Sequence, residues 1–379
     1  MEQMMVPAEA PVKEGAPVKE EAAAKMKPAI LLIDQSDANL RLMAQCGAVE
    51  IVAPYPGDDF STTLPALAKR IASFGLTLSV IERFIPHEKI LHDLPGRDEE
   101  MVMLKELVRV AGEVGVKTLC YNWMPSSDWT RTSIAERDRG GCLVTAFDSS
   151  APAITTSGQT IHAAESAKGT VKTAEQLWST LERFLVDILP TCEACGVSLA
   201  IHPDDPPMKI LGGKPQIVYS VAQAQKVVEL VRSSANGVCF CVGTFAEAQE
   251  DCPAAIRALG TAIKFVHFRD VVSEVKGEKF REAWQDSGDT DMPDVIRALK
   301  EIGFDGPIRP DHVPTLEGEV CSFLGARLRC FVPHPSSLTP SVCIPPPPAP
   351  DKRAAGLSRA GKIMGARLHQ GVDGRSVKK

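Results

Sequence analysis

Short apolar runs alternate with longer amphipathic segments from residue 28 onward. The runs are almost continuously apolar, which is typical of parallel strands that are covered on both faces. Eight of them occur, at residues 29–33, 49–53, 76–81, 117–120, 197–201, 237–241, 263–266 and 306–308. A helical spacing of apolar residues predicts helices between them, at 37–46, 63–74, 99–114, 173–195, 220–233, 246–259 and 294–302.

This alternation predicts an α/β fold, a (β/α)8 TIM barrel with insertions. A doubly wound open sheet is the alternative, but no glycine-rich phosphate loop follows the first run. The largest gap separates the fourth and fifth runs, and its loop at 128–159 is a natural place for a lid or cap. The eighth helix should follow His312, where the chain instead becomes rich in proline. We therefore expect that helix to be missing or replaced.

The two ends of the chain depart from the barrel pattern. Residues 1–27 are mostly Ala, Glu, Lys and Pro, without an apolar face, and are expected to be a disordered extension. Residues 320–379 are basic and include four consecutive prolines at 345–348, which favour an extended polyproline conformation. We expect this divergent tail to be mostly disordered and the catalytic domain to span residues 28–319.

Charge and cysteine content narrow the class of protein. Residues 320–379 hold ten Lys or Arg and two Asp, which leaves 32 basic and 46 acidic residues in the first 319. Such an acidic body argues against a nucleic-acid partner. Eleven cysteines without framework spacing indicate reduced thiols. With no membrane-length apolar stretch and no signal-peptide pattern, a cytoplasmic protein without a membrane partner is expected.

Polar residues stand at the ends of the last four predicted strands. His202 follows the fifth run, Cys241 ends the sixth, His267 follows the seventh and Asp311 follows the eighth. In a barrel these ends are neighbours at the carboxyl end, where the active sites of this fold lie. Imidazole, thiolate and carboxylate together suit Mn, Fe, Co or Zn. Each residue alone has a structural explanation, but four on consecutive strands favour a metal site.

A polar and aromatic segment follows the fourth predicted strand. Its candidate ligand-binding residues are Tyr121, Asn122, Asp128, Trp129 and Arg131. An arginine can bind a carboxylate with two hydrogen bonds, and amide or carboxylate groups can bind hydroxyls. The segment therefore suits a polyhydroxylated acid, although an ordinary turn held by tryptophan packing explains it equally well.

Several motifs together resemble the mannonate dehydratase family. They are His202-Pro-Asp-Asp-Pro-Pro, the Cys241 strand end, His267-Phe-Arg-Asp, Ser287-Gly-Asp-Thr-Asp-Met292, Ile308-Arg-Pro-Asp-His312, Tyr121-Asn-Trp-Met-Pro and Asp128-Trp-Thr-Arg131. The resemblance implies a barrel of the xylose-isomerase-like kind. It also implies a lyase that converts D-mannonate into 2-dehydro-3-deoxy-D-gluconate in hexuronate (glucuronate) catabolism, with Mn²⁺ or Fe²⁺ as cofactor.

The resemblance also implies roles for single residues. His202, Cys241, His267 and Asp311 would be the metal ligands, and His312 would be a catalytic acid or base. Arg309 and the segment after the fourth strand, from Tyr121 to Arg131, would contact the substrate. The expected partner is therefore a small sugar acid, and a homo-oligomer is compatible with the sequence.

The resemblance has one clear gap. Members of the family carry a catalytic tyrosine in a Pro-Gly-Tyr segment after the Asp-His pair, whereas no tyrosine follows Tyr219 in this sequence. Three hypotheses therefore stand: an active hydro-lyase, a metal-dependent sugar isomerase or epimerase on the same barrel, and a catalytically impaired variant.

Overall fold

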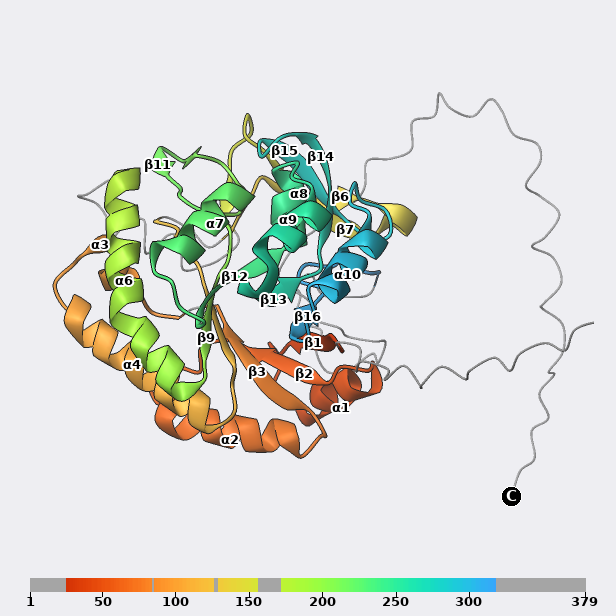
Figure 1. Ribbon diagram of the computed structural model, residues 1–379. Helices are drawn as coiled ribbons and strands as arrows, with labels where there is room; N and C mark the ends of the chain where they lie inside the picture. The colour runs from red at the N-terminus through yellow and green to blue at the C-terminus, as the bar shows by residue number, and fades with distance from the viewer. Residues whose placement is uncertain (1–24, 84, 126–128, 156–171, 318–379) are drawn as a thin grey trace, which may run out of the picture. The chain divides into compact units, whose positions relative to one another are not determined.

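A closed barrel of eight parallel strands forms the centre of the molecule (Figure 1). The computed structural model describes residues 25–83, 85–125, 129–155 and 172–317. Around the barrel the strands follow the order β1-β16-β13-β12-β9-β4-β3-β2. Their bounds are Lys27–Leu31 (β1), Glu50–Ala53 (β2), Thr77–Glu82 (β3), Thr118–Tyr121 (β4), Ser198–Ile201 (β9), Asn236–Cys241 (β12), Ile263–His267 (β13) and Pro307–Arg309 (β16). The predicted TIM barrel is confirmed, and each of the eight predicted runs overlaps one barrel strand.

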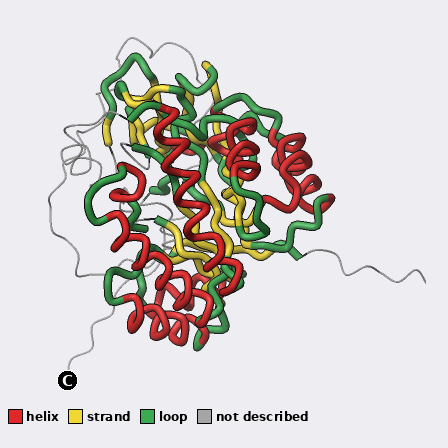
Figure 2. Tube along the Cα trace, turned by 60° about the vertical axis from the view of Figure 1, so that its left-hand side comes forward, coloured by secondary structure: helices red, strands yellow, loops and turns green. Residues whose placement is uncertain are grey.

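Helices cover the outside of the barrel (Figure 2). They are α1 (Asp37–Gln45), α2 (Phe60–Ala72), α3 (Glu88–His92), α4 (Arg97–Glu113), α6 (Ala174–Cys195), α7 (Val221–Leu230), α8 (Val242–Glu247), α9 (Cys252–Leu259) and α10 (Met292–Glu301). The long α6 begins with a capping box between Thr173 and Gln176 and ends at Gly196, whose φ of 66° suits glycine. Its buried leucines face the core between helices and barrel.

One predicted helix is two helices in the structure. The segment 246–259 was expected to be continuous, but α8 ends at Glu247 and α9 begins at Cys252. Pro253 stands in the first turn of α9, where its missing N–H costs no hydrogen bond, and Asp251 caps the helix by accepting from the Ala254 N–H. A new helix start therefore interrupts the periodic apolar pattern.

An antiparallel sheet lies outside the barrel order and was not predicted. It joins β14 (Asp270–Val275), β15 (Lys279–Ala283), β7 (Leu143–Asp148) and β6 (Ser133–Arg137) in that order. The expected lid loop at 128–159 is therefore largely strand where it is described. Since β6 and β7 follow β4 while β14 and β15 follow β13, this sheet ties two distant connections together.

Small elements complete the described chain. Two-stranded pairs join β5 (Thr130–Arg131) to β8 (Ile154–Thr155) and β10 (Ile210–Leu211) to β11 (Lys214–Pro215), and short 3-10 turns lie at Arg139–Gly141 and Gly260–Ala262. Of the terminal extension expected at 1–27, residues 25–27 are described and Lys27 already belongs to β1. The rest of that extension, the tail at 320–379 and the expected place of the eighth helix lie outside the described residues. Within the described ranges no helix combines the length and apolar content of a bilayer span.

The barrel interior has two layers that matter for function. The lower layer is mainly apolar and includes Leu31, Val52, Cys120, Cys239 and Phe265. Side chains alternate along a strand, so residues two positions nearer the carboxyl end form the next layer. That upper layer is polar, and it contains the candidate site.

Candidate functional site

The four residues expected to bind a metal lie together at the carboxyl end of the barrel. One ligand atom each from His202, Cys241 and His267 lies within 4.8 Å of the other two. Asp311 completes the group, because its Oδ2 is 3.7 Å from Cys241 Sγ and 3.6 Å from His267 Nδ1. They come from β9, β12, β13 and β16, which are consecutive around the barrel. The sequence prediction that these strand ends meet agrees with this geometry.

A sharp turn after β16 directs Asp311 into the group. Pro310 follows the strand, and Asp311 adopts φ 63°, a left-handed conformation that is uncommon for a residue with a side chain. Burial raises the pKa of the Asp311 carboxyl, but His312, His267 and Arg309 outweigh burial and hold the pKa well below its usual range. The carboxylate is therefore charged and can act as a ligand.

The donor set fits a transition metal. Both ring nitrogens of His267 lack a hydrogen-bond partner among the described residues, although the ring is almost completely buried. His202 Nδ1 lies 2.6 Å from the Pro203 carbonyl oxygen, which can only accept a hydrogen bond. Nδ1 must therefore carry the proton, which leaves the Nε2 lone pair for a metal. Imidazole, thiolate and carboxylate donors point to a borderline divalent metal without selecting one.

Cys241 has a hydrogen-bond donor of its own. The Thr244 hydroxyl, one turn into α8, lies 3.2 Å from Cys241 Sγ and can donate to it. The same hydroxyl oxygen accepts from Arg269 NH2 at 2.9 Å. A donor to sulfur stabilises a thiolate, which is the form of cysteine that binds metals.

His312 stands at the edge of this group with one nitrogen fixed. Its Nδ1 is 2.6 Å from Glu282 Oε1 and 3.0 Å from Arg269 Nη1, and its Nε2 is 3.6 Å from Asp311 Oδ1. The shorter contact is to a carboxylate oxygen, which has no proton to give, so we assign the Nδ1 proton to a hydrogen bond with Glu282, and Nε2 faces the candidate ligands. The side chain is 18% exposed, against 4% for Asp311. His312 is thus partly open to solvent, as is His202, whereas Cys241, His267 and Asp311 are buried.

Glu282 was not predicted as a site residue. It lies on β15 of the outer sheet, in a segment whose sequence gave no strand prediction. Burial raises the pKa of Glu282, but the charges of His312 and Arg131 outweigh burial and lower the pKa to about 2. Residues 279–283 read Lys-Phe-Arg-Glu-Ala and do not alternate regularly between polar and apolar, so the local pattern carried no signal for an inward-facing Glu282.

Two buried arginines hold the acidic residues around His312. Arg269 contacts Glu247, Glu282 and Asp205 at 2.9, 3.1 and 2.9 Å. Arg131 pairs with Asp205 and Glu282, and all five of its N–H groups donate to Thr145 Oγ1, the Thr130 carbonyl, Asp205 or Glu282.

The full occupation of Arg131 has a direct consequence for substrate binding. The predicted substrate contact at Arg131 is not retained, because no guanidinium donor is left for a substrate carboxylate. The arginine supports the wall of the site instead. Trp129 lies over it, with Arg131 Cζ 4.7 Å from the Trp129 ring centroid.

The other predicted substrate contacts are distributed unevenly. Trp129 meets the His312 ring edge-on at 4.8 Å between centroids. Arg309 makes two hydrogen bonds to Glu82, at 2.7 and 2.9 Å, and contacts Asp311 Oδ1 at 2.9 Å. Asn122 Oδ1 accepts from the Met124 N–H at 3.5 Å. Asp128 lies outside the described residues.

Tyr121 lies on the wrong side of its strand for a substrate contact. Because Cys120 points into the barrel, Tyr121 points outward. Its ring is buried against Trp123 and Phe184, with centroids 6.3 and 5.4 Å away. Tyr121 therefore packs between the barrel and α6, and the prediction that it contacts substrate is withdrawn.

Sequence comparison places the chain in a family. The profile described as UxuA, D-mannonate dehydratase, matches residues 35–325. The chain belongs to the D-mannonate dehydratase family. It is 36% identical over 271 residues to a mannonate dehydratase of Oceanobacillus iheyensis, covering 67% of this chain and 77% of that protein. A Streptococcus uberis mannonate dehydratase is 35% identical over 273 residues, with 67% and 78% coverage.

Solved structures agree with this family. The crystal structure of mannonate dehydratase from Streptococcus suis serotype 2 matches with a TM-score of 0.71 and 29% identity, over 80% of this chain and 90% of that chain. A xylose isomerase domain protein from Alicyclobacillus acidocaldarius matches with a TM-score of 0.53 and 14% identity, over 75% and 88%. At that identity the likeness shows the fold alone. The resemblance to mannonate dehydratases seen in the sequence motifs is confirmed.

Proposed function

We propose that the protein is a metal-dependent hydro-lyase that converts D-mannonate into 2-dehydro-3-deoxy-D-gluconate, in the breakdown of hexuronates. The observation that carries this proposal is the meeting of His202, Cys241, His267 and Asp311 beside a histidine whose Nδ1 is fixed by Glu282. Membership in the D-mannonate dehydratase family supports the choice of substrate.

The reaction removes a proton from C2 and the hydroxyl from C3, and the enol that results tautomerises to the 2-keto acid. A divalent cation such as Mn²⁺ or Fe²⁺, held by the four ligands, would act as a Lewis acid that stabilises negative charge near the substrate carboxylate. The leaving hydroxyl needs a proton, because hydroxide is a poor leaving group.

His312 is suited to deliver that proton. With Nδ1–H donated to Glu282, the second proton of an imidazolium sits on Nε2, which faces Asp311 and the ligand group. Glu282 balances the imidazolium charge and prevents the ring from turning. Trp129, edge-on to the same ring, limits the positions that a substrate can take beside it.

Recognition of the sugar acid falls to the remaining groups at this end of the barrel. Asn122 is half-buried and can bind a hydroxyl, and Arg309 contributes positive charge beside Asp311. Arg131 and Tyr121 are engaged elsewhere in the fold. We therefore place the substrate between Asn122, Trp129, Arg309 and His312.

The test is to purify the full chain with Mn²⁺, supply D-mannonate and assay the 2-keto product. We expect product from the wild type, and at least a 100-fold lower kcat for His312→Gln. His92→Gln, which alters a histidine in the outer helix α3, is the matched control. A folded, metal-loaded wild type that yields no product would overturn the proposal and favour an impaired variant. Conversion of neutral sugars instead would favour an isomerase or epimerase.

A further inference from the structure

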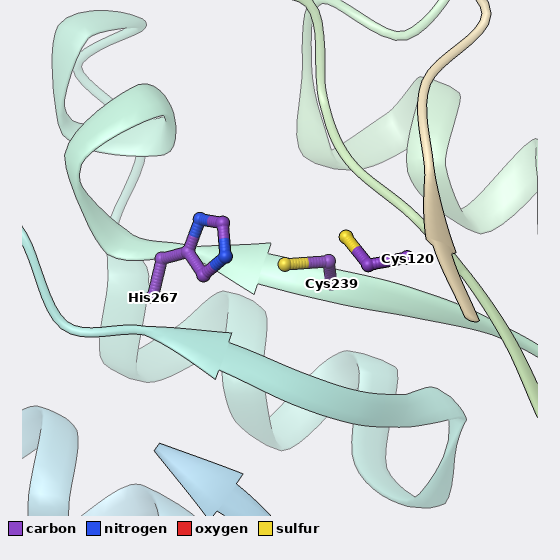
Figure 3. Close-up of side chains that lie close together, drawn as sticks. All are labelled: Cys120, Cys239 and His267. Carbon is purple, nitrogen blue, oxygen red and sulfur yellow. The ribbon is translucent and has the colours of Figure 1, made fainter. Parts of the chain in front are cut away.

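Two thiols occupy the barrel layer directly beneath the candidate metal ligands. Cys120 comes from β4 and Cys239 from β12, and both are buried. Their sulfur atoms and one nitrogen of His267 all lie within 4.8 Å of one another. Figure 3 shows the Cys239 sulfur facing the imidazole, with the Cys120 sulfur beside it. The proposed dehydration uses neither thiol.

His267 belongs to two groups of possible ligands at once. In the upper group it meets His202 and Cys241, and in the lower group it meets Cys120 and Cys239. Its ring has a nitrogen near each acidic neighbour, since Nε2 is 3.2 Å from Glu82 Oε1 and Nδ1 is 3.6 Å from Asp311 Oδ2. Neither nitrogen has a hydrogen-bond partner among the residues described, so a metal could bind through the imidazole in either layer.

The donor chemistry of the lower group differs from that of the upper group. Two sulfurs and one imidazole select thiophilic ions such as Zn²⁺, Cd²⁺ or Cu⁺ over Mn²⁺, which prefers oxygen. Two thiolates and a neutral imidazole around a divalent ion form an uncharged unit. Such a unit suits the apolar layer of Leu31, Val52 and Phe265.

The distances permit binding after a small contraction. A tetrahedral zinc ion with bonds of about 2.0 to 2.3 Å holds its ligand atoms roughly 3.5 to 3.8 Å apart. The atoms of Cys120, Cys239 and His267 would therefore close by at most about 1.0 to 1.3 Å from the 4.8 Å limit.

We propose that Cys120, Cys239 and His267 form a second metal site, which takes thiophilic divalent ions beneath the upper ligand group. The two sites share one imidazole, and an ion on one ring nitrogen makes the other nitrogen a weaker donor. A thiophilic ion in the lower site would therefore weaken binding of the catalytic metal above it.

The test counts the sulfur ligands of a bound probe ion. Cd²⁺ is added at one equivalent to the metal-free full chain, and the thiolate-to-cadmium absorption in the ultraviolet is recorded. We expect the intensity of two thiolates in the wild type, about half of it in Cys120→Ala and in Cys239→Ala, and no change in Cys241→Ala. Cys192→Ala, at a buried thiol of α6, is the matched control and should match the wild type.

A band that disappears in Cys241→Ala and is unchanged in Cys120→Ala and Cys239→Ala would overturn the proposal, because the ion would then occupy the upper group alone. A second measurement uses only the wild type, so its result does not depend on whether the variants fold. X-ray absorption of the Cd²⁺-loaded wild type should show two sulfur ligands, and a single one would contradict the second site. No sugar enters either measurement, so the result is independent of whether the chain dehydrates mannonate.

Discussion

Glu282 fixes the orientation of His312 through a single short contact. The 2.6 Å separation from His312 Nδ1 makes it the orienting partner that catalytic and metal-binding histidines usually have. Arg131 and Arg269 in turn hold the Glu282 carboxylate, at 2.8 and 3.1 Å. Proton transfer at Nε2 therefore depends on a residue that need not touch the substrate.

Replacing Glu282 by glutamine should lower kcat while leaving KM nearly constant. An amide is a weaker acceptor for Nδ1–H and carries no charge to balance an imidazolium, so we expect a loss of roughly 10 to 100-fold. Steady-state kinetics with D-mannonate measures both constants. Glu278→Gln, an exposed position at the start of the same β15 hairpin, should change neither. An unaltered kcat in Glu282→Gln would show that the contact does not orient the general acid His312.

Asp205 should contribute stability that depends on pH. Burial raises the pKa of its carboxyl, but Arg131 and Arg269 outweigh burial and hold the pKa below its usual range. An acid with a depressed folded pKa stabilises the fold above its unfolded pKa of about 3.9, and this contribution is lost as the pH falls. We expect Asp205→Asn to lower the free energy of unfolding by about 3 to 5 kcal/mol at pH 7, and by less as the pH falls toward 3.

Urea unfolding of both proteins across this pH range measures the difference. Asp286→Asn, which breaks an exposed and solvent-screened pair with Arg139, should leave the free energy of unfolding nearly unchanged. A difference between wild type and Asp205→Asn that is constant with pH would contradict the assigned charge.

At the scale of single residues, the sequence was informative where strand ends decide position. His202, Cys241, His267 and Asp311 could be expected to meet, because parallel barrel strands end on the same side. The position of Glu282 could not be expected, since it lies on β15, whose pairing with β7 joins two connections that are distant in sequence. Tyr121 was wrongly expected to face the substrate. Neighbouring residues of a strand point to opposite sides, and Cys120 points into the barrel.

The short helix α8 lies so close to the buried Arg269 that the second residue of the helix, Gly243, has no room for a side chain. A Cβ added at Gly243 would lie 2.1 Å from Arg269 Nε. The same guanidinium bonds Thr244 Oγ1 and Glu247 Oε1 on that helix, both at 2.9 Å. The start of α8 and Arg269 therefore form one packed unit behind Cys241.

Gly243→Ala should displace Arg269 and break these bonds. We expect a loss of about 2 to 4 kcal/mol in the free energy of unfolding, together with weaker metal binding through Cys241. Denaturant unfolding and equilibrium dialysis of Mn²⁺ measure the two effects. Gly47→Ala introduces alanine at φ 83° with no atom within 4 Å of the new Cβ, so it reports backbone strain alone. Equal losses in the two variants would rule out the clash with Arg269.

Among the elements, the eight strands were predictable because buried parallel strands are almost continuously apolar. The break between α8 and α9 was missed because Asp251 and Pro253 act as a helix start inside a periodic stretch. The outer sheet was missed because its strands are partly exposed and because its central pairing, β7 with β15, joins two hairpins more than 130 residues apart, which local pattern does not reveal.

On the scale of the whole molecule, metal binding and folding should be linked. The four ligands come from segments that are distant in sequence, so an unfolded chain offers no comparable site. A ligand that binds only the native state stabilises it by about 2.7 kcal/mol at one hundred times its dissociation constant.

Saturating Mn²⁺ should therefore raise the melting temperature of the metal-free protein by several degrees. Differential scanning calorimetry at increasing Mn²⁺ concentration measures this shift, and chelation should reverse it. Asp311→Asn removes one charged ligand and should show a much smaller shift. An equal shift in this variant would place the ion elsewhere on the protein.

The pairing of β1 with β16 decides when this site can exist during synthesis. Lys27 pairs with Pro307, so the first barrel strand cannot complete its pairing until a strand 280 residues later in the chain has been synthesised. At a synthesis rate of about 5 to 20 residues per second, the gap is on the order of half a minute. Asp311 and His312 follow that last strand directly, so the nascent chain acquires its full ligand set only as the barrel closes. Loading of the complete site with metal is thus a step that follows the pairing of the first strand with the last.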